Sequence, residues 1–518
     1  FQVAAEAVTG RPDQVEEAGP DDEPAFELTQ AGESHKITTH PGGLQEALEE
    51  DERLIAGGAR VTVILRDGVY RGAYSLRGKD AGGALVIQAE AGAAPIMSGS
   101  EPLTGWVAET DALWCVPWPH RFELSSAPPD YGDPWLATPD LMRRCEQIIL
   151  GGRALRQVLE RDDLTPGTFW IDDNANLAFM HPPVGGDPAT QSVEASARSQ
   201  LLHLTSVSGL TVRGLRFEHD ASGFYLPQTG ALQLTNCKQV QVEHCTFAAN
   251  NNKVLQIDGR DSEDITLSDL IFLDNGCVGL LASRVQGLSL ERVSFTGQNR
   301  RGAWAGHYRG SPAGAKIMKS QRVRISNCRA IRNLCTGLWL DERNRDVEIT
   351  DSVFSSNYRG LHVEATPGPV LIERCTITDN RREPTPTQWA WRFGSGLALT
   401  HAQAVTVRAC TLSGNDTAQI GVRHDRETRR LRDTLTGEES EEFTADITLE
   451  ANTILAARGQ ACLQIPGPGF DGARCWESFK AFDNYYAAAE PGRGFVVSDR
   501  DAVQTLGFAD WAELSGQD

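Results

Sequence analysis

The sequence predicts an all-β fold, a right-handed parallel β-helix with a small β-sandwich subdomain inserted before the main helix. Three observations predict it. A short repeat recurs about every 23–25 residues, apolar and polar residues alternate within each copy, and most copies end in asparagine. Such a period with β-branched alternation is typical of stacked parallel strands. Because a solenoid grows by adding coils, a chain of 518 residues fits one such array.

The repeat follows the pattern V-x-V/I-x-x-C-x-F-x-x-N. Leucine-rich repeats share this period, but they need leucine at fixed positions and a helical side, and the sequence has neither. An asparagine at one corner of every coil predicts a ladder of side-chain hydrogen bonds between coils. The clear copies lie at 240–250, 265–275, 323–333, 347–357, 370–380 and 405–415, and weaker ones at 210–220, 288–298 and 447–457.

A second strand follows each asparagine, and its alternation places two columns of side chains on one outer face of the helix. The middle of this face combines Lys316, Trp339 and His362 with the acids Asp341 and Glu364. The first column is Gln233, Gln256, Leu281, Lys316, Trp339, His362, Ala398 and Gly421, and the second is Thr235, Asp258, Ser283, Met318, Asp341, Glu364, Thr400 and Arg423.

The chain divides into five predicted parts. The opening is acidic, which predicts a loose tail. The segment Gly43–Leu54 has the pattern of an amphipathic helix and is expected to cap the β-helix. The insertion is rich in tryptophan, and its hairpin-like segment at 167–183 favours a packed β-sandwich over an irregular long loop. The parts are a tail (1–35), a cap with the first coils (36–100), the insertion (101–192), the main β-helix (193–497) and a helical cap (498–518), with the last helix expected over Ser498–Leu514.

Composition restricts the partners. A net charge of −21 disfavours nucleic acid and anionic membranes. No apolar run is long enough for a transmembrane helix. The chain starts at Phe1, so we expect a secreted or periplasmic protein whose targeting segment was removed, with the cytoplasm left open. The repeat cysteines (Cys245, Cys328, Cys375 and Cys410) are expected in the core, and a homo-oligomer remains open.

Asp341 and Glu364 form the candidate catalytic pair. They occupy equivalent positions in successive copies, GLWLD and GLHVE, and neighbouring strands lie about 4.8 Å apart, so their carboxyls are expected about 5 Å apart. Retaining glycosidases hold nucleophile and acid/base about 5–5.5 Å apart. The alternatives are two solvated acids or a calcium site, so structural calcium stays open. No phosphate-binding loop implies an organic cofactor, and no metal is required.

The stretch GLWLD…GLHVEATPGP resembles the β-xylosidases of glycoside hydrolase family 120, which carry a WLD motif and, 23 residues later, an E-x-x-H-G-P motif. The resemblance implies a β-helix of the pectate-lyase-like kind, interrupted by a β-sandwich. It also implies that Asp341 is the nucleophile and Glu364 the general acid/base. Two positions depart from the family, which has tryptophan at 342 and histidine at 367, where this chain has Glu342 and Pro367.

Further residues are expected to bind the substrate, an oligo- or polysaccharide of plant or algal origin. Trp339 and His362 would orient sugar hydroxyls, and Lys316 would pair with Asp341 or contact an acidic sugar. Tryptophans on the insertions 298–314 and 381–394 offer apolar platforms for sugar rings. A third insertion, His424–Thr444, is charge-rich and expected to be solvated. The candidates on the first two insertions are Trp304, His307, Trp389 and Trp391. Arg423, in the second column of the outer face, is the last substrate-binding candidate.

Two other function classes remain open. A polysaccharide lyase acting on uronic acids would use a base and a cation among residues of this face, with Asp341, Glu364 and Asp258 holding calcium. A non-catalytic carbohydrate-binding β-helix would need no acid pair. The residues available to a lyase as base or charge neutraliser are Lys316, Lys319, His362, Arg343, Arg359 and Arg423.

Overall fold

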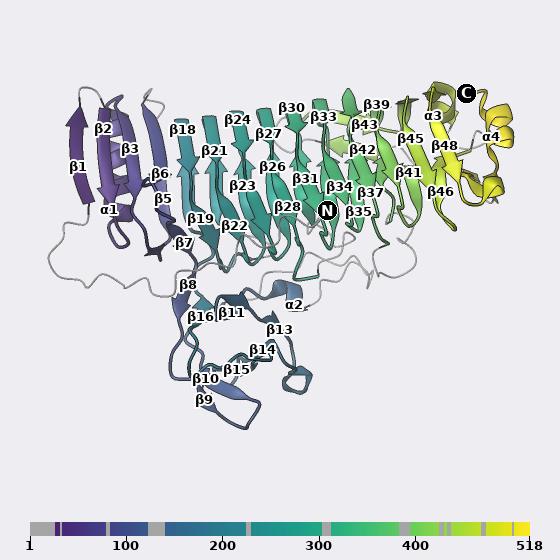
Figure 1. Cartoon of the computed structure of the whole chain (residues 1–518). Coiled ribbons are helices and arrows are strands. Elements are labelled where there is room, and N and C mark those ends of the chain that lie inside the picture. Colours follow the sequence, from purple (N-terminus) through teal and green to yellow (C-terminus); the bar gives the residue numbers. More distant parts are fainter. Residues whose placement is uncertain are drawn as a thin grey trace.

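The computed structural model describes residues 26–31, 34–78, 83–122, 140–223, 229–302, 312–382, 394–423, 429–432, 437–467, 473–499 and 502–517. The chain is a right-handed parallel β-helix, as predicted. Three long sheets, named A, B and C here, run along the solenoid, and a smaller body hangs from one side near its N-terminal end (Figure 1). The loop candidates for substrate binding, Trp304, His307, Trp389 and Trp391, lie outside the described residues.

Each full coil contributes one strand to each sheet, in the order C, A, B. Sheet A consists of β1 (Phe26–Ala31), β2 (Ser34–Thr39), β3 (Arg60–Leu65), β6 (Ala84–Ala89), β18 (Ser208–Arg213), β21 (Lys238–Glu243), β24 (Glu263–Ser268), β27 (Gln286–Glu291), β30 (Gln321–Ser326), β33 (Arg345–Thr350), β36 (Val370–Glu373), β39 (Gln403–Arg408), β44 (Ala445–Glu450) and β47 (Lys480–Phe482).

Sheet B is built from short strands. It consists of β4 (Val69–Tyr70), β7 (Ile96–Ser98), β19 (Arg216–Glu218), β22 (Thr246–Ala248), β25 (Ile271–Leu273), β28 (Ser294–Thr296), β31 (Arg329–Ile331), β34 (Val353–Ser355), β37 (Thr376–Thr378), β40 (Thr411–Ser413), β45 (Thr453–Ala456) and β48 (Tyr485–Ala488).

Sheet C carries the candidate residues. It consists of β5 (Tyr74–Arg77), β17 (Leu202–Thr205), β20 (Leu232–Thr235), β23 (Lys253–Asp258), β26 (Val278–Ser283), β29 (Ala313–Met318), β32 (Thr336–Asp341), β35 (Arg359–Glu364), β38 (Leu397–Thr400), β41 (Ala418–Arg423), β46 (Ala461–Pro466), β49 (Phe495–Asp499) and β50 (Ala502–Leu506).

The predicted asparagine ladder forms at the corner between sheets B and C. The Asn357 side-chain amide donates to the Ala330 carbonyl (2.9 Å) and to Oδ1 of Asn380 (3.1 Å), and the pattern repeats from coil to coil. Close packing here explains the glycine that follows in each GL motif. A Cβ added at Gly360 would lie 2.8 Å from Nδ2 of Asn380 and 2.6 Å from the Gly396 carbonyl oxygen. The ladder thus fixes the start of each sheet C strand.

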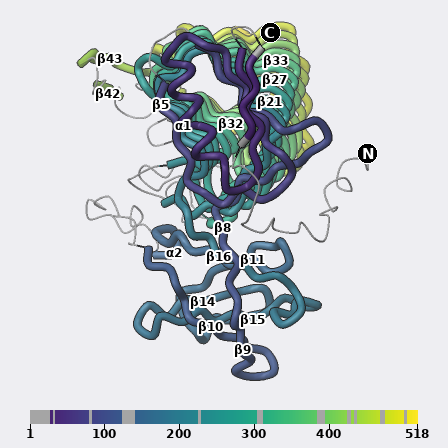
Figure 2. Tube along the Cα trace, turned by 90° about the vertical axis from the view of Figure 1, so that its left-hand side faces the viewer, coloured from purple at the N-terminus to yellow at the C-terminus, as the bar shows by residue number. Residues whose placement is uncertain are grey.

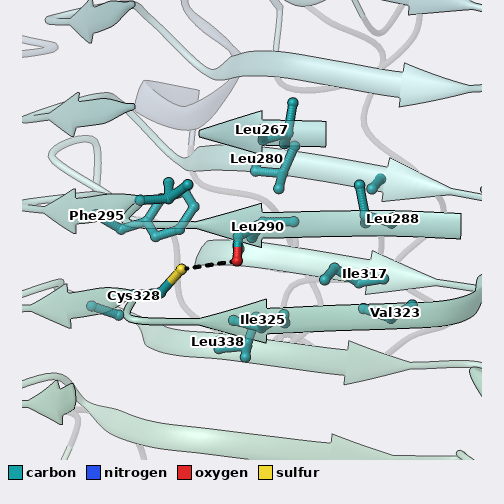
Figure 3. Close-up of a cluster of buried hydrophobic side chains, with 14 of the residues drawn as sticks. Leu267, Leu280, Leu288, Leu290, Phe295, Ile317, Val323, Ile325, Cys328 and Leu338 are labelled. Atoms are coloured by element: carbon teal, nitrogen blue, oxygen red, sulfur yellow. Dashed lines mark hydrogen bonds between the residues drawn. The ribbon is translucent and has the colours of Figure 1, made fainter. Parts of the chain in front are cut away.

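The interior of the coils is filled by matching side chains from successive rungs. Leu, Ile, Val and Phe occupy equivalent positions, and phenylalanine rings stack along the axis, as between Phe247 and Phe272 at 4.7 Å. The four repeat cysteines are buried thiols, as predicted. Figure 3 shows Cys328 in this cluster, with its thiol 3.6 Å from the Leu290 carbonyl oxygen. This regular core holds every strand in a fixed register.

The insertion forms two sheets around a second core. One sheet has β13 (Arg156–Gln157), β14 (Thr168–Asp172), β15 (Leu177–His181), β10 (Trp114–Pro117) and β9 (Val107–Ala108), and the other has β12 (Arg153–Ala154), β11 (Ile148–Leu150), β16 (Val193–Ser196) and β8 (Ser100–Pro102). The core between them includes Val116, Trp118, Ile148, Phe169 and Met180. Helix α2 (Asp140–Arg143) lies where this body meets the solenoid (Figure 2).

The two ends correct the sequence predictions. Regular structure begins inside the expected tail, because β1 pairs antiparallel with β2 and covers the first edge of sheet A, while α1 (Leu44–Ala56) packs on the first coil as predicted. At the other end, the helix expected over 498–514 is wrong in its first half. Residues 502–506 form β50, which covers the edge of sheet C, and only α4 (Phe508–Ser515) is helical. Open strand edges favour such pairing.

The last coil is closed by side chains of α3 (Ala473–Ser478) and α4. Trp511 is buried there and stacks on Phe495 at 4.9 Å. Across the described ranges, no helix has both the length and the apolar character needed to span a membrane.

Candidate functional site

The candidate site lies on the outer face of sheet C, where β29, β32, β35 and β38 are consecutive neighbours. The register places Lys316 beside Trp339, Trp339 beside His362, and Met318 beside Asp341. Glu364 lies beside Thr400, which in turn lies beside Arg423. Both predicted columns therefore exist in the predicted order. We call the side chains of these two columns the sheet C face.

Lys316 and Asp341 form the central ion pair of the sheet C face. The Lys316 ammonium lies 2.9 Å from Oδ2 of Asp341, and both side chains are almost fully buried, 5% and 7% exposed. The same ammonium lies 4.0 Å from the centre of the Trp339 ring, within cation–π range. A cation held between a carboxylate and an aromatic face cannot rotate freely, so the Asp341 carboxylate has a defined position. This confirms the expected partnership of Lys316 with Asp341.

Arg429 joins the two candidate acids. One of its guanidinium nitrogens lies 3.0 Å from Oε1 of Glu364 and 3.9 Å from Oδ1 of Asp341. The two carboxylate oxygens are therefore no more than about 7 Å apart, a span that includes the 5–5.5 Å of retaining glycosidases. The spacing of adjacent strands and the shared Arg429 cation both indicate that the two carboxyls lie close together on the same side of the sheet.

Arg429 belongs to the insertion expected to be solvated, and this expectation holds for most of the described charges of the insertion but not for Arg429. The insertion contains a hairpin of β42 (Arg429–Arg432) and β43 (Glu439–Glu442), which lies on the sheet C side of the solenoid (Figure 2). Arg343 fastens it by donating to the carbonyls of Leu431 (2.6 Å) and Glu438 (2.8 Å). The Arg430 and Arg432 side chains stay 84% and 74% exposed, whereas that of Arg429 is 32% exposed and reaches the acid pair.

His362 is held by its neighbours rather than by solvent. It contacts Arg359 through Nδ1, lies 3.4 Å from the Thr400 hydroxyl through Nε2, and tilts against the Trp339 ring at 5.2 Å. Its Nδ1 is also 3.6 Å from Oε2 of Glu364. His362 therefore links the aromatic part of the sheet C face to the second acid.

Close to the acid pair, the face has buried polar atoms that make no hydrogen bond with the described part of the chain. They include Nε1 of Trp339 and Oδ1 of Asp341. Buried donors and acceptors are nearly always satisfied, and an unsatisfied one costs about 1–3 kcal/mol. Both atoms lie within the predicted catalytic region, where a ligand could satisfy them.

The remaining predicted residues have different surroundings. Lys319 pairs with Glu342 at 2.9 Å, so the residue that stands where the resembling family has tryptophan is part of an ion pair. Asp258 lies further along the sheet, where it accepts a hydrogen bond from Gln256. Arg423 lies two coils beyond Glu364 in the register. Among the residues that the structure describes, no group of three or more His, Cys, Asp and Glu side chains is placed to hold a metal ion.

Sequence reasoning missed two residues of sheet C and its surroundings. They are Arg429, which joins the two acids, and Lys253, a buried cation of β23 two coils before the strand of Lys316. Arg429 is 65 residues from Glu364 and outside the repeat, so no spacing connects them. The only available signal was the charge run of its insertion. Lys253 stands one residue before the apolar run of its strand, and the repeat assigned it to no column. Neither residue could be located by the period alone.

Comparisons with known proteins agree with this architecture. A family model described as a right-handed β-helix region matches residues 200–412. Comparison with curated proteins found no significant match. The chain is similar to the structure described as "The complex structure of XylC with xylose", with a TM-score of 0.66 and 15% identity, covering 87% of this chain and 82% of that chain.

A second solved structure is more distant. The mannuronan C-5 epimerase AlgE4 A-module of Azotobacter vinelandii has a TM-score of 0.48 and 13% identity, covering 88% of this chain and 92% of that chain. The likeness to the XylC structure shows a shared β-helix fold, in agreement with the fold that the sequence predicts.

Proposed function

We propose that the protein is a retaining glycoside hydrolase that cleaves an oligo- or polysaccharide at the sheet C face. The observation that carries the proposal is the pair of carboxylates on adjacent rungs, Asp341 and Glu364, bridged by one guanidinium nitrogen. Retaining hydrolysis needs two carboxyls close enough to act on opposite sides of one glycosidic bond in turn.

Asp341 is the proposed nucleophile. Its carboxylate is fixed by Lys316, while Oδ1 makes no hydrogen bond with described residues and so remains available. In the first step Oδ1 would attack the anomeric carbon and form a covalent glycosyl–enzyme as the bond to the leaving oxygen breaks. Lys316 would hold the carboxylate in line with that carbon.

Glu364 is the proposed acid/base. Its carboxyl would protonate the leaving oxygen in the first step and take a proton from water in the second, when water releases the sugar from Asp341. Arg429 lies between the two carboxyls, where the scissile oxygen would have to enter. Its side chain must therefore move aside when a glycan binds, which a residue on a partly exposed hairpin can do.

The substrate-binding proposal rests on Trp339 and His362. Trp339 Nε1 is a buried donor without a partner among described residues, and His362 lies between the Trp339 ring and Glu364. Both are suited to hold sugar hydroxyls near the reacting carbon. The likeness in fold to a structure containing xylose is consistent with a carbohydrate ligand.

The ion pairs favour hydrolysis over the calcium-dependent lyase alternative. In a lyase of that kind the acids would serve as calcium ligands, but here Asp341 is already matched by Lys316 at 2.9 Å and Glu364 by Arg429 at 3.0 Å. Carboxylates neutralised by protein cations have less charge left for a divalent ion.

The test is a screen of aryl glycosides and plant or algal polysaccharides, with and without EDTA, that follows both reducing ends and ultraviolet absorbance of unsaturated sugars. We expect EDTA-insensitive release of reducing ends without new absorbance. Calcium-dependent absorbance would replace the proposal with a lyase, and glycan binding without any product would replace it with a binding protein.

A further inference from the structure

Lys253, at the start of β23, is a buried cation that the proposed mechanism does not use. Its residue is 3% exposed, and its ammonium makes no hydrogen bond or ion pair with any part of the chain that the structure describes. In the register it lies beside Val278 of β26, two coils before the strand of Lys316. An unpaired buried charge is costly, so such groups are normally paired or bind a ligand.

Two charged residues of the sheet C face act on the Lys253 ammonium. Burial and the neighbouring Lys316 cation lower the pKa of Lys253 to about 7, while the Asp258 carboxylate and the Cys277 thiol act in the opposite direction. Lys316 and Asp258 both belong to the sheet C face. The ammonium therefore lies within the electrostatic reach of the face that carries the acid pair.

Two hydrogen-bond acceptors accompany the ammonium on the same stretch of chain. Oδ1 of Asn252 and Oε1 of Gln256 are buried and accept no hydrogen bond from described residues. Their amide nitrogens are engaged, that of Asn252 with the Gly223 carbonyl and that of Gln256 with Asp258 at 3.1 Å. The two side chains are thus oriented, and the atoms left open are acceptors suited to sugar hydroxyls.

The inserted subdomain is fixed beside this position. Met142 of α2 packs against Cys277 and Val278, the neighbours of Lys253, with Leu281 of the sheet C face partly buried against them. Arg301 secures the contact, donating to Oε1 of Gln157 and to the Glu146 carbonyl. An apolar wall on one side explains why the cation is poorly hydrated.

We propose that Lys253, with Asn252 and Gln256, forms a subsite for an anionic sugar, a carboxylate or sulfate ester on the glycan, whose hydroxyls donate to the two amide oxygens. The strand of Lys253 is three coils from that of Asp341, about 14 Å along the solenoid. That is longer than one sugar residue, so the anionic unit is not the one cleaved. The substrate class is then an acidic glycan, an assignment that rests on the proposed hydrolase for the position of the cleaved bond.

The experiment measures binding without turnover, by calorimetry on the full chain carrying Glu364→Gln. Three probes are compared: oligogalacturonides for carboxylate, carrageenan oligosaccharides for sulfate, and xylo-oligosaccharides as the neutral series. We expect an acidic series to bind better than the neutral one. Lys253→Met should weaken that acidic series by at least about tenfold, since a hydrogen bond to a charged group contributes about 1.5–3 kcal/mol. Lys253→Arg should retain it, and Lys480→Met, on sheet A, serves as the control.

A second measurement is the pH profile of binding. The acidic series needs the protonated ammonium, so its affinity should fall as the pH rises through about 7, while neutral binding stays level. Equal binding of acidic and neutral series, or an unchanged affinity in Lys253→Met, overturns the subsite. Neither result bears on catalysis. Hydrolysis of neutral glycans without a preference for acidic ones would contradict only the subsite, and binding of acidic glycans without hydrolysis would contradict only the proposed function.

Discussion

Two ion pairs of this solenoid link adjacent coils in different surroundings. Lys316 and Asp341 lie on sheet C at 2.9 Å, with side chains 5% and 7% exposed. Arg374 and Asp351 lie at the corner after sheet A at 2.9 Å, with side chains 51% and 42% exposed. The coil geometry is the same, but only the first pair is removed from water.

The difference teaches that position in a repeat does not decide the role of a charge. The Arg374 guanidinium lowers the pKa of Asp351 through a hydrogen bond, but water surrounds both groups and screens the pair. The Lys316–Asp341 pair is shielded, so each partner depends on the other. Of the two pairs, only the buried one can hold a reacting carboxylate in a fixed position.

The largest expected effect tests the buried carboxylate directly. Asp341→Asn keeps the shape but removes the charge and the nucleophile, so turnover should fall by about 10⁴-fold or more. The rate of glycoside cleavage measures it. The matched control is Asp351→Asn, which removes the charge of an exposed acid at the sheet A corner and should leave turnover within a few fold. Near-wild-type activity in Asp341→Asn would remove Asp341 from the mechanism.

The second effect concerns the cation of the same pair. Lys316→Met leaves the Asp341 carboxylate buried without its cation, which should destabilise the fold by about 3–5 kcal/mol. The melting temperature measures it, with wild type and Lys316→Arg beside it. A melting temperature equal to wild type would show that Asp341 does not depend on Lys316.

The third effect depends on pH and sharpens the contrast between paired and unpaired buried charges. The pKa of Lys253 is about 7 in the folded chain against an ordinary 10.5, so the unfolded chain binds more protons between these values. The destabilising contribution of Lys253 is full below about pH 7 and fades as the pH rises toward 10.5. Lys253→Met should therefore raise the melting temperature most in acid and least near pH 10.

Calorimetric melting of wild type and Lys253→Met across this pH range measures the third effect. A difference between the two that stays constant with pH would mean that Lys253 titrates normally and is not a desolvated cation.

The smallest effect belongs to the exposed pair. Arg374→Met removes the partner of Asp351 at the sheet A corner but strands no charge away from water, so no measurable change in melting temperature or turnover is expected. A loss comparable to that of Lys316→Met would show that coil position, not burial, sets the contribution of these pairs.

The sequence predicted what the repeat determines. A period of about 24 residues with two-residue alternation located the asparagine ladder, the core cysteines and both columns of the sheet C face, because each depends only on the register of one coil on the next. Lys316 beside Trp339, and Trp339 beside His362, follow from counting residues.

The sequence could not predict what comes from outside the repeat. Arg429 reaches the acid pair from a hairpin whose course depends on its anchorage by Arg343. Burial of Lys253 depends on side chains packed around it, including those near α2 of the insertion. At the C-terminus, the need to cover an open edge of sheet C outweighed a helix-like pattern and made residues 502–506 a strand.

The most direct test of the central claim is the anomeric configuration of the first sugar released, followed by proton NMR on the glycoside that the screen identifies. Two carboxyls on adjacent rungs predict retention, with no unsaturated sugar formed. Release of the inverted anomer would show that water, not Asp341, attacks the sugar, and an unsaturated product would show that the chemistry of this face is elimination.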